Sequence, residues 1–220
     1  MLLVSSSFSL ALVALFSLVA NPAVEATSHT ICFDYFMMKD GCVFSTNDPK
    51  KRCEPDGKPP KQGVGVLKSP GQKKHRRDEV SLERRYDTPK GSKSFFVSDG
   101  TGICGTYRGD QPGACLWAGG QDGLGNPTGG WLNGTKTSNC GKQLYLQRQG
   151  KPETVQYVPV LDGCDFNIKT EYPGCFQIAV TEHTFYSMNP TAEELRKGYL
   201  TGLTWDFNNL NGDKTRNGPI

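Results

Sequence analysis

The chain has 220 residues, of which 36% are hydrophobic and 21% are charged, with a formal net charge of +3. Residues 27–85 carry 13 Lys and Arg against 8 Asp and Glu, whereas residues 86–220 carry 12 against 13. Because the longer second part is nearly neutral, composition gives no argument for nucleic-acid binding, and we expect no nucleic-acid partner.

The N-terminus is typical of a secretory signal peptide. Residues 10–20 form an uncharged, mostly apolar stretch, which suits an export signal but is shorter than the roughly 20 residues needed to cross a bilayer. Small residues around Ala26 predict cleavage after that position, so residues 1–26 are interpreted as the signal peptide. A buried core helix is the alternative. No second long apolar run follows, and we therefore predict a secreted, extracellular protein without a membrane partner.

Export would place the cysteines in an oxidising compartment, where an even count predicts disulfide bonds. The eight cysteines are Cys32, Cys42, Cys53, Cys104, Cys115, Cys140, Cys164 and Cys175. There is no CxxC pair and the three histidines are scattered, so we expect no metal site. No phosphate-binding or other cofactor motif is present, and no cofactor is predicted.

The segment from Asp48 to Arg85 is rich in Pro, Gly, Lys and Arg and poor in apolar residues. Such a segment buries too little surface to offset its ordering entropy, so we expect it to be mostly disordered. Basic runs ending at Arg77 and Arg85 resemble sites of kexin-type processing proteases, with an uncleaved solvated linker as the alternative. Residues 27–85 are thus interpreted as a basic, cysteine-containing pro-region or linker, and residues 86–220 as one domain.

Short apolar stretches between turn residues predict about six strands in this domain. They cover residues 94–98, 103–108, 143–148, 154–160, 175–180 and 203–207. Pro159 within the fourth stretch implies a bulge or an edge position. Acidic residues in the first turn, basic residues in the last and a Gly stop predict a helix over residues 189–198. The polar tail after Phe207 is expected to be frayed, and the whole pattern favours an all-β, closed or nearly closed barrel.

Four motifs in order carry a resemblance to a known superfamily. They are residues 105–107 with 113–117 (GTY, GACLW), 139–142 (NCGK), 160–164 (VLDGC) and 198–205 (closing on LTW). Together they resemble the double-psi β-barrels of the rare-lipoprotein-A-like, barwin and expansin superfamily over about residues 94–207. Within this superfamily, the sequence resembles secreted fungal, effector-type members. The resemblance implies a six-stranded double-psi β-barrel with one or two short helices, here preceded by a largely disordered N-terminal pro-segment.

The resemblance to barwin implies that Cys115 pairs with Cys140. Cys164 and Cys175 are close in sequence and flank a polar loop, which predicts a second bond between them. Cys104 and the three N-terminal cysteines then remain and could form two bonds, one of which ties Cys104 to the N-terminal segment. In that case, processing at the dibasic sites would nick the chain without releasing its N-terminal piece.

Enzymes of this superfamily hydrolyse glycosidic bonds with a pair of carboxylates. The resemblance places Asp162 at one such position and Asp110 loosely at another, while Gln177 replaces the third carboxylate and cannot transfer a proton in that role. Asp162 therefore has no convincing partner, and we assign no catalytic residue beyond the weak candidates Asp162 and Asp110. The alternatives for Asp162 are a structural carboxylate bonded to loop backbone amides and a ligand-binding group.

Three residues are candidate ligand contacts: Asp162, Tyr107 in the first motif, and Trp131. Trp131 lies among glycines and is expected to be exposed, whereas Trp205 lies in a strand motif and is expected in the core. Asn133 begins the only N-glycosylation sequon, and a glycan there would shield the same loop.

These observations favour a non-catalytic, monomeric binding protein. The resemblance implies a fungal effector-type protein that acts in a plant host by binding a host protein or a cell-wall polysaccharide. Two alternatives belong to other classes: a wall-active glycoside hydrolase or lytic transglycosylase built on Asp162 and Asp110, and a protease inhibitor.

Overall fold

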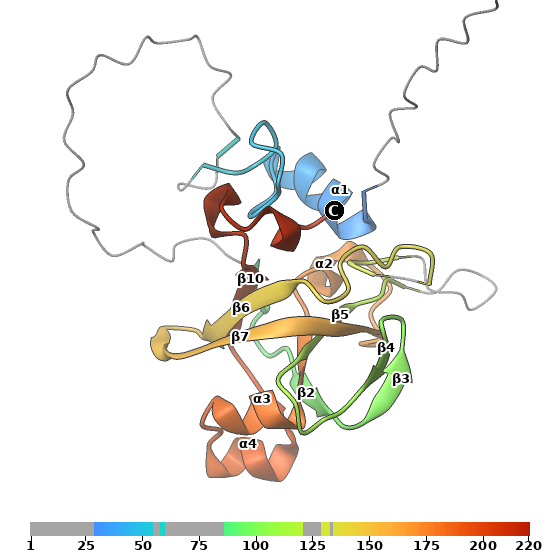
Figure 1. Cartoon of the computed structure of the whole chain (residues 1–220). Helices are drawn as coiled ribbons and strands as arrows, with labels where there is room; N and C mark the ends of the chain where they lie inside the picture. The colour runs from blue at the N-terminus through green and yellow to red at the C-terminus, as the bar shows by residue number, and fades with distance from the viewer. Residues whose placement is uncertain (1–28, 55–57, 60–85, 121–128, 133) are drawn as a thin grey trace, which may run out of the picture.

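The computed structural model describes residues 29–54, 58–59, 86–120, 129–132 and 134–220 (Figure 1). The predicted signal peptide ending at Ala26, the processing sites at Arg77 and Arg85 and the sequon at Asn133 lie outside these residues. Within the described part of the chain, no helix is both long enough and apolar enough to cross a membrane.

The described chain is mostly β-structure, arranged as one curled eight-stranded sheet, a small hairpin and a few short helices (Figure 1). The order in the sheet is β1-β10-β6-β7-β5-β8-β2-β9, and β3 pairs with β4. The strands are β1 (Tyr86–Asp87), β2 (Ser94–Val97), β3 (Gly100–Gly102), β4 (Gly105–Tyr107), β5 (Ala114–Trp117), β6 (Gln143–Arg148), β7 (Lys151–Cys164), β8 (Ile178–Thr181), β9 (Tyr199–Leu200) and β10 (Leu203–Phe207).

Every predicted strand region contains a strand, but four strands were not predicted. Three of them, β1, β3 and β9, have only two or three residues, too few for an alternating pattern to be read. The fourth, β5, is buried at all four positions, so it shows no alternation either. It nevertheless lies centrally, between β7 and β8.

The long strand β7 joins the two halves of the sheet. It runs antiparallel to β6 and parallel to β5, and β2 and β8 form a second parallel pair. In the pairing with β5, Ala114 lies opposite Val160 but Cys115 lies opposite Asp162, so Leu161 is an extra residue. This bulge lies two residues after Pro159, which is itself paired with Gln143 of β6, so it is not at the position for which the proline implied one.

The predicted helix is confirmed as α4 (Ala192–Lys197). Thr191 Oγ1 accepts a hydrogen bond from the Glu194 N–H, and the Glu194 carboxylate accepts one from the Thr191 N–H, which together form a capping box. Gly198 ends the helix in the left-handed region at φ +73°. The other helices are α1 (Ile31–Asp40), α2 (Glu171–Gly174), α3 (Glu182–Ser187) and the 3₁₀ turns Leu210–Gly212 and Thr215–Asn217.

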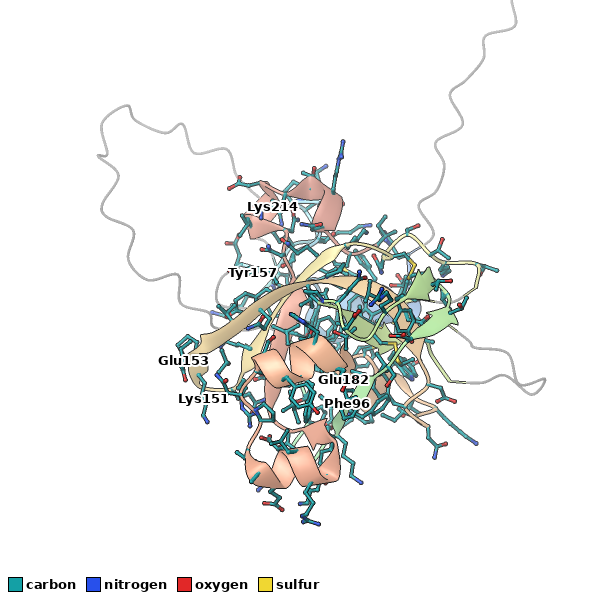
Figure 2. All side chains as sticks on the ribbon, turned by 60° about the horizontal axis from the view of Figure 1, so that its bottom comes forward. Phe96, Lys151, Glu153, Tyr157, Glu182 and Lys214 are labelled. Atoms are coloured by element: carbon teal, nitrogen blue, oxygen red, sulfur yellow. A yellow bond between two sulfur atoms is a disulfide. The ribbon has the colours of Figure 1, made fainter. Side chains whose placement is uncertain are left out.

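Helices α3 and α4 lie at the opposite end of the sheet from α1 (Figure 1). Phe96 of β2 packs against Phe185 of α3, with ring centroids 5.1 Å apart. Figure 2 shows Phe96 and Glu182 at this end, and Lys151 and Glu153 at the outer tip of the β6–β7 hairpin. The two ends of the sheet are therefore covered by different parts of the chain.

Residues 29–54 and 208–220 lie together over one end of the sheet, and we call these two segments the cap (Figure 1). Thr30 donates from its N–H and its hydroxyl to the Ile220 carbonyl at 3.2 and 2.7 Å. Asn209 Nδ2 donates to Ser45 O at 2.7 Å, and Lys142 Nζ donates to Gly218 O at 2.6 Å. The expectation of a frayed tail is therefore wrong, because the tail's polar groups bond to the rest of the protein.

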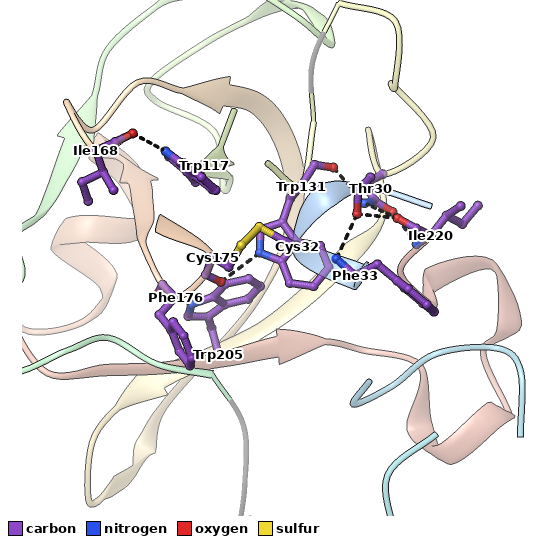
Figure 3. Close-up of a disulfide and its surroundings, with 11 residues drawn as sticks. Thr30, Cys32, Phe33, Trp117, Trp131, Ile168, Cys175, Phe176, Trp205 and Ile220 are labelled. Atoms are coloured by element: carbon purple, nitrogen blue, oxygen red, sulfur yellow. Dashed lines mark hydrogen bonds between the residues drawn. A yellow bond between two sulfur atoms is a disulfide. The ribbon is translucent and has the colours of Figure 1, made fainter. Parts of the chain in front are cut away.

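Helix α1 contributes aromatic side chains to the core. Phe33 and Phe36 are almost fully buried, and the Phe36 ring centroid lies 4.6 Å from that of Tyr86. Cys32 on the same helix forms a disulfide with Cys175 of the body (Figure 3). Residues 29–54 are thus folded, which corrects the expectation of a largely disordered N-terminal segment for this stretch.

The prediction of disulfide bonds is confirmed, but both predicted pairings are wrong. The bonds are Cys32–Cys175, Cys42–Cys53, Cys104–Cys140 and Cys115–Cys164. Cys115 and Cys164 lie on the neighbouring parallel strands β5 and β7, a proximity that their distance in sequence does not reveal. A disulfide does tie the N-terminal segment to the body, as predicted. It is formed with Cys175, however, and not with Cys104.

Candidate functional site

Asp162 is held where β7 passes the β3–β4 hairpin. Its Oδ1 accepts hydrogen bonds from the Ile103 N–H at 2.6 Å and from the Gly163 N–H at 2.7 Å, and the residue is only 8% exposed. A Cβ at Gly102 would lie 1.9 Å from Asp162 Oδ2, so the hairpin approaches the carboxylate closely. These contacts are those of a structural carboxylate that fastens the hairpin to the sheet.

Tyr107 is the second predicted contact, and the structure brings it to Asp162. The Asp162 carboxylate lies near enough to the Tyr107 hydroxyl to influence its pKa. Burial first, and then the nearby negative charge of Asp162, raise the pKa of Tyr107 above its usual value. The structure therefore places these two predicted contacts beside each other.

Asp110 lies elsewhere and has a different partner. Arg108 Nε donates to Asp110 Oδ1 at 2.9 Å, and a second Arg108 nitrogen contacts Oδ2. The pair is exposed, and the hydrogen bonds from Arg108 lower the pKa of Asp110. Asp110 lines a shallow cleft with His183 and Tyr186 of α3. Among the described residues, no hydrogen bond or shared partner connects Asp110 to Asp162.

Gln177 occupies the position where the resemblance places a further carboxylate. It is buried, and its Nε2 donates to Ser92 Oγ at 2.6 Å. Its Oε1 is buried without a hydrogen-bond partner among the described residues. The side chain is therefore a fixed amide in the protein interior.

Trp131 is not an exposed contact, which corrects that prediction. Its exposure is 0%, and its indole N–H donates to the Cys175 carbonyl at 3.0 Å, beside the Cys32–Cys175 bond (Figure 3). A Cβ at Gly130 would lie 2.2 Å from Trp117 O, so this glycine lets the loop lie against β5 and directs Trp131 inwards. Trp205 is buried as predicted.

A groove that the sequence did not suggest lies near the start of the domain. It has a volume of about 530 Å³ and is lined by residues 87–91, Gln149, Tyr172, Phe176 and residues 201–202. We call it the Tyr172 groove, because the Tyr172 side chain is 60% exposed there. Tyr172 belongs to the segment between Cys164 and Cys175, for which the sequence predicts only a polar loop.

Within the described residues, no three His, Cys, Asp or Glu side chains are grouped so that they could hold a metal ion. The cysteines are all engaged in disulfides.

Comparison with known proteins gives no assignment for this arrangement. No protein-family model matches the chain. No curated protein matches it either.

Proposed function

We propose that this chain is a secreted, non-catalytic binding protein built on a six-stranded double-psi β-barrel. In this proposal it acts outside the cell as an effector-type protein of a fungus and binds a host protein or a cell-wall polysaccharide. The four motifs of the sequence support the superfamily and the host setting.

The observation that carries the proposal is that both candidate carboxylates are already engaged. Hydrolysis of a glycosidic bond needs two carboxyl groups that face the same bond and can exchange protons with it. Asp162 is buried and bonded to two backbone N–H groups, while Asp110 is paired with Arg108. Gln177, at the remaining position, is an amide that cannot take part in proton transfer.

Two further features support the setting and the fold. Four disulfides are typical of proteins made for an oxidising, extracellular compartment. The parallel pairs β2–β8 and β5–β7 join strands that are distant in sequence, so their connections must cross the sheet. Crossing connections of this kind are a feature of the double-psi barrel and favour it over an up-and-down meander.

The proposal is tested by incubating the purified secreted chain with cellulose, chitin and peptidoglycan. Two quantities are measured: the fraction of protein retained and the reducing ends released. In parallel, proteins captured from host extract are purified and their direct, saturable binding is measured. Retention on a polysaccharide or saturable binding of a purified host protein, without released reducing ends, supports the proposal.

Release of reducing ends that disappears in the Asp162→Asn variant would instead establish a hydrolase. Release of soluble anhydro-sugar fragments from peptidoglycan, without new reducing ends, would establish a lytic transglycosylase. The folded state of that variant is checked by circular dichroism, because Asp162 also fastens the β3–β4 hairpin. Asp110→Asn is measured beside it, because a hydrolase built on both carboxylates would lose its activity in this variant too, while the exposed ion pair with Arg108 contributes little to the fold.

A further inference from the structure

The Tyr172 groove combines an exposed aromatic ring with a rigid support. The Tyr172 ring stands edge-to-face on Phe176, with centroids 5.6 Å apart. Phe176 in turn packs against Phe36 of α1 at 5.1 Å, and its carbonyl accepts a hydrogen bond from the Trp205 indole at 3.0 Å. The exposed ring is therefore mounted on the disulfide-linked aromatic core.

The walls of the groove are also fixed. The Gln149 N–H donates to Gly202 O at 2.8 Å, which joins the β6–β7 turn to the β9–β10 turn. The Thr88 N–H donates to Leu203 O at 2.9 Å and holds the segment after β1 against β10. A site whose floor and walls are already in place loses little conformational entropy when a ligand binds.

Polar groups surround the ring. Lys90 and Thr201 are exposed, and their side chains have no hydrogen-bond or ion-pair partner in the described part of the chain. Asp87 lies on the same rim and accepts a hydrogen bond from the Thr204 hydroxyl. One acidic and one basic group face the groove, so it has no net charge that would select a strongly charged ligand.

This combination suits a sugar. A sugar ring has an apolar C–H face that matches an aromatic surface, and hydroxyl groups around its edge that match amide, hydroxyl and ammonium groups. The exposed Tyr172 ring and the polar groups of the rim offer both kinds of contact. The volume of about 530 Å³ is in the usual range for ligand sites.

From these observations we infer that the Tyr172 groove binds an uncharged glycan chain, with one sugar ring stacked on Tyr172 and its hydroxyls bonded to Lys90 and Thr201. The inference rests on the proposed binding function and assigns it a site and a ligand class. The site is separate from Asp162, Tyr107 and Asp110, none of which lines the groove.

The test is calorimetric titration of the full secreted chain with cellohexaose and chitohexaose, and with oligogalacturonate as the anionic comparison. We expect one of the two neutral oligosaccharides to bind and the anionic one not to bind. Tyr172→Ala should weaken that binding at least tenfold, and Lys90→Met several-fold. Tyr172→Phe keeps the ring face and should stay within threefold of the wild type.

Tyr157→Ala is the matched control, because Tyr157 is 52% exposed but lies on β7 outside the groove (Figure 2). It should bind as the wild type does, and the thermal midpoint of every variant is measured to confirm that it is folded at the temperature of the titration. Equal binding by Tyr172→Ala and the wild type would overturn the inference while leaving a non-catalytic glycan-binding protein. Binding only to a purified host protein, or to no ligand, would also overturn the inference. Release of reducing ends from a polysaccharide would instead overturn the proposed function.

Discussion

Removing the Cys32–Cys175 disulfide should cost more stability than removing any bond that closes a short loop. This bond joins α1 to the body across a sequence separation of 143 residues. Cys42–Cys53, by contrast, closes a separation of 11 residues inside the cap. The matched variants are the double substitutions Cys32→Ala with Cys175→Ala and Cys42→Ala with Cys53→Ala.

The expected costs follow from the entropy that each bond removes from the unfolded chain. With the other disulfides intact, the shortest path from Cys32 to Cys175 runs through Cys42–Cys53 and Cys115–Cys164, and it is about 85 residues long. Closing such a loop is worth about 4.5 kcal/mol, whereas closing a loop of 11 residues is worth about 2.8 kcal/mol. The first variant should therefore lose about 1.5 to 2 kcal/mol more than the second.

Urea unfolding of the oxidised full chain, followed by both tryptophan fluorescence and circular dichroism, measures the difference. Coincident transitions by the two probes are needed before the free energies of unfolding are compared. An equal or smaller loss in the Cys32–Cys175 variant would refute the idea that this bond fastens the cap to the body.

Three other predictions concern single sites. Asp162→Ala should destabilise the protein by about 3 kcal/mol in urea unfolding, because it leaves buried backbone donors unpaired. Asp110→Ala removes an exposed carboxylate and should change the stability by less than about 0.5 kcal/mol, so similar losses in the two variants would contradict the assigned roles. Burial lowers the pKa of Lys142 in the folded protein to about 8. In the unfolded chain the lysine keeps its ordinary pKa of about 10.5, so between these two pH values the unfolded state binds one proton more than the folded state. The stability of the wild type relative to Lys142→Met should therefore rise between pH 7 and 10, by at most about 3 kcal/mol, and a flat or falling difference would show that the ammonium is not desolvated. If processing occurs after Arg85, non-reducing mass measurement should find the N-terminal piece still attached through Cys32–Cys175, and the body alone would contradict that tether.

Local patterns in the sequence predicted the parts of the fold that local forces determine. The strand at β6 and the helix at α4 have their own alternation, caps and stop residues, and each lies close to its predicted range. Local patterns mislead at positions whose environment is formed by residues elsewhere in the chain. Trp131 shows this, because its neighbouring glycines suggest exposure while α1, about 100 residues earlier, covers it.

The disulfide pairing and the cap could not be predicted for the same physical reason. Cys115 meets Cys164 only because β5 and β7 pair in parallel, and Ile220 meets Thr30 only after both ends of the chain have packed on the sheet. The Asp162–Tyr107 contact is a partial success, since both residues were selected from motifs and the structure brings them together. The Tyr172 groove was missed because its aromatic rings and polar rim come from four separate segments.

The central claim is that the chain binds its target outside the cell without cleaving it. The most direct measurement follows protein retention and reducing-end release together, on insoluble cellulose and chitin, for the wild type, Tyr172→Ala and Asp162→Asn. We predict saturable retention of the wild type, reduced retention of Tyr172→Ala, and no reducing ends from any of the three. Reducing ends that accumulate with the wild type and disappear with folded Asp162→Asn would contradict the claim.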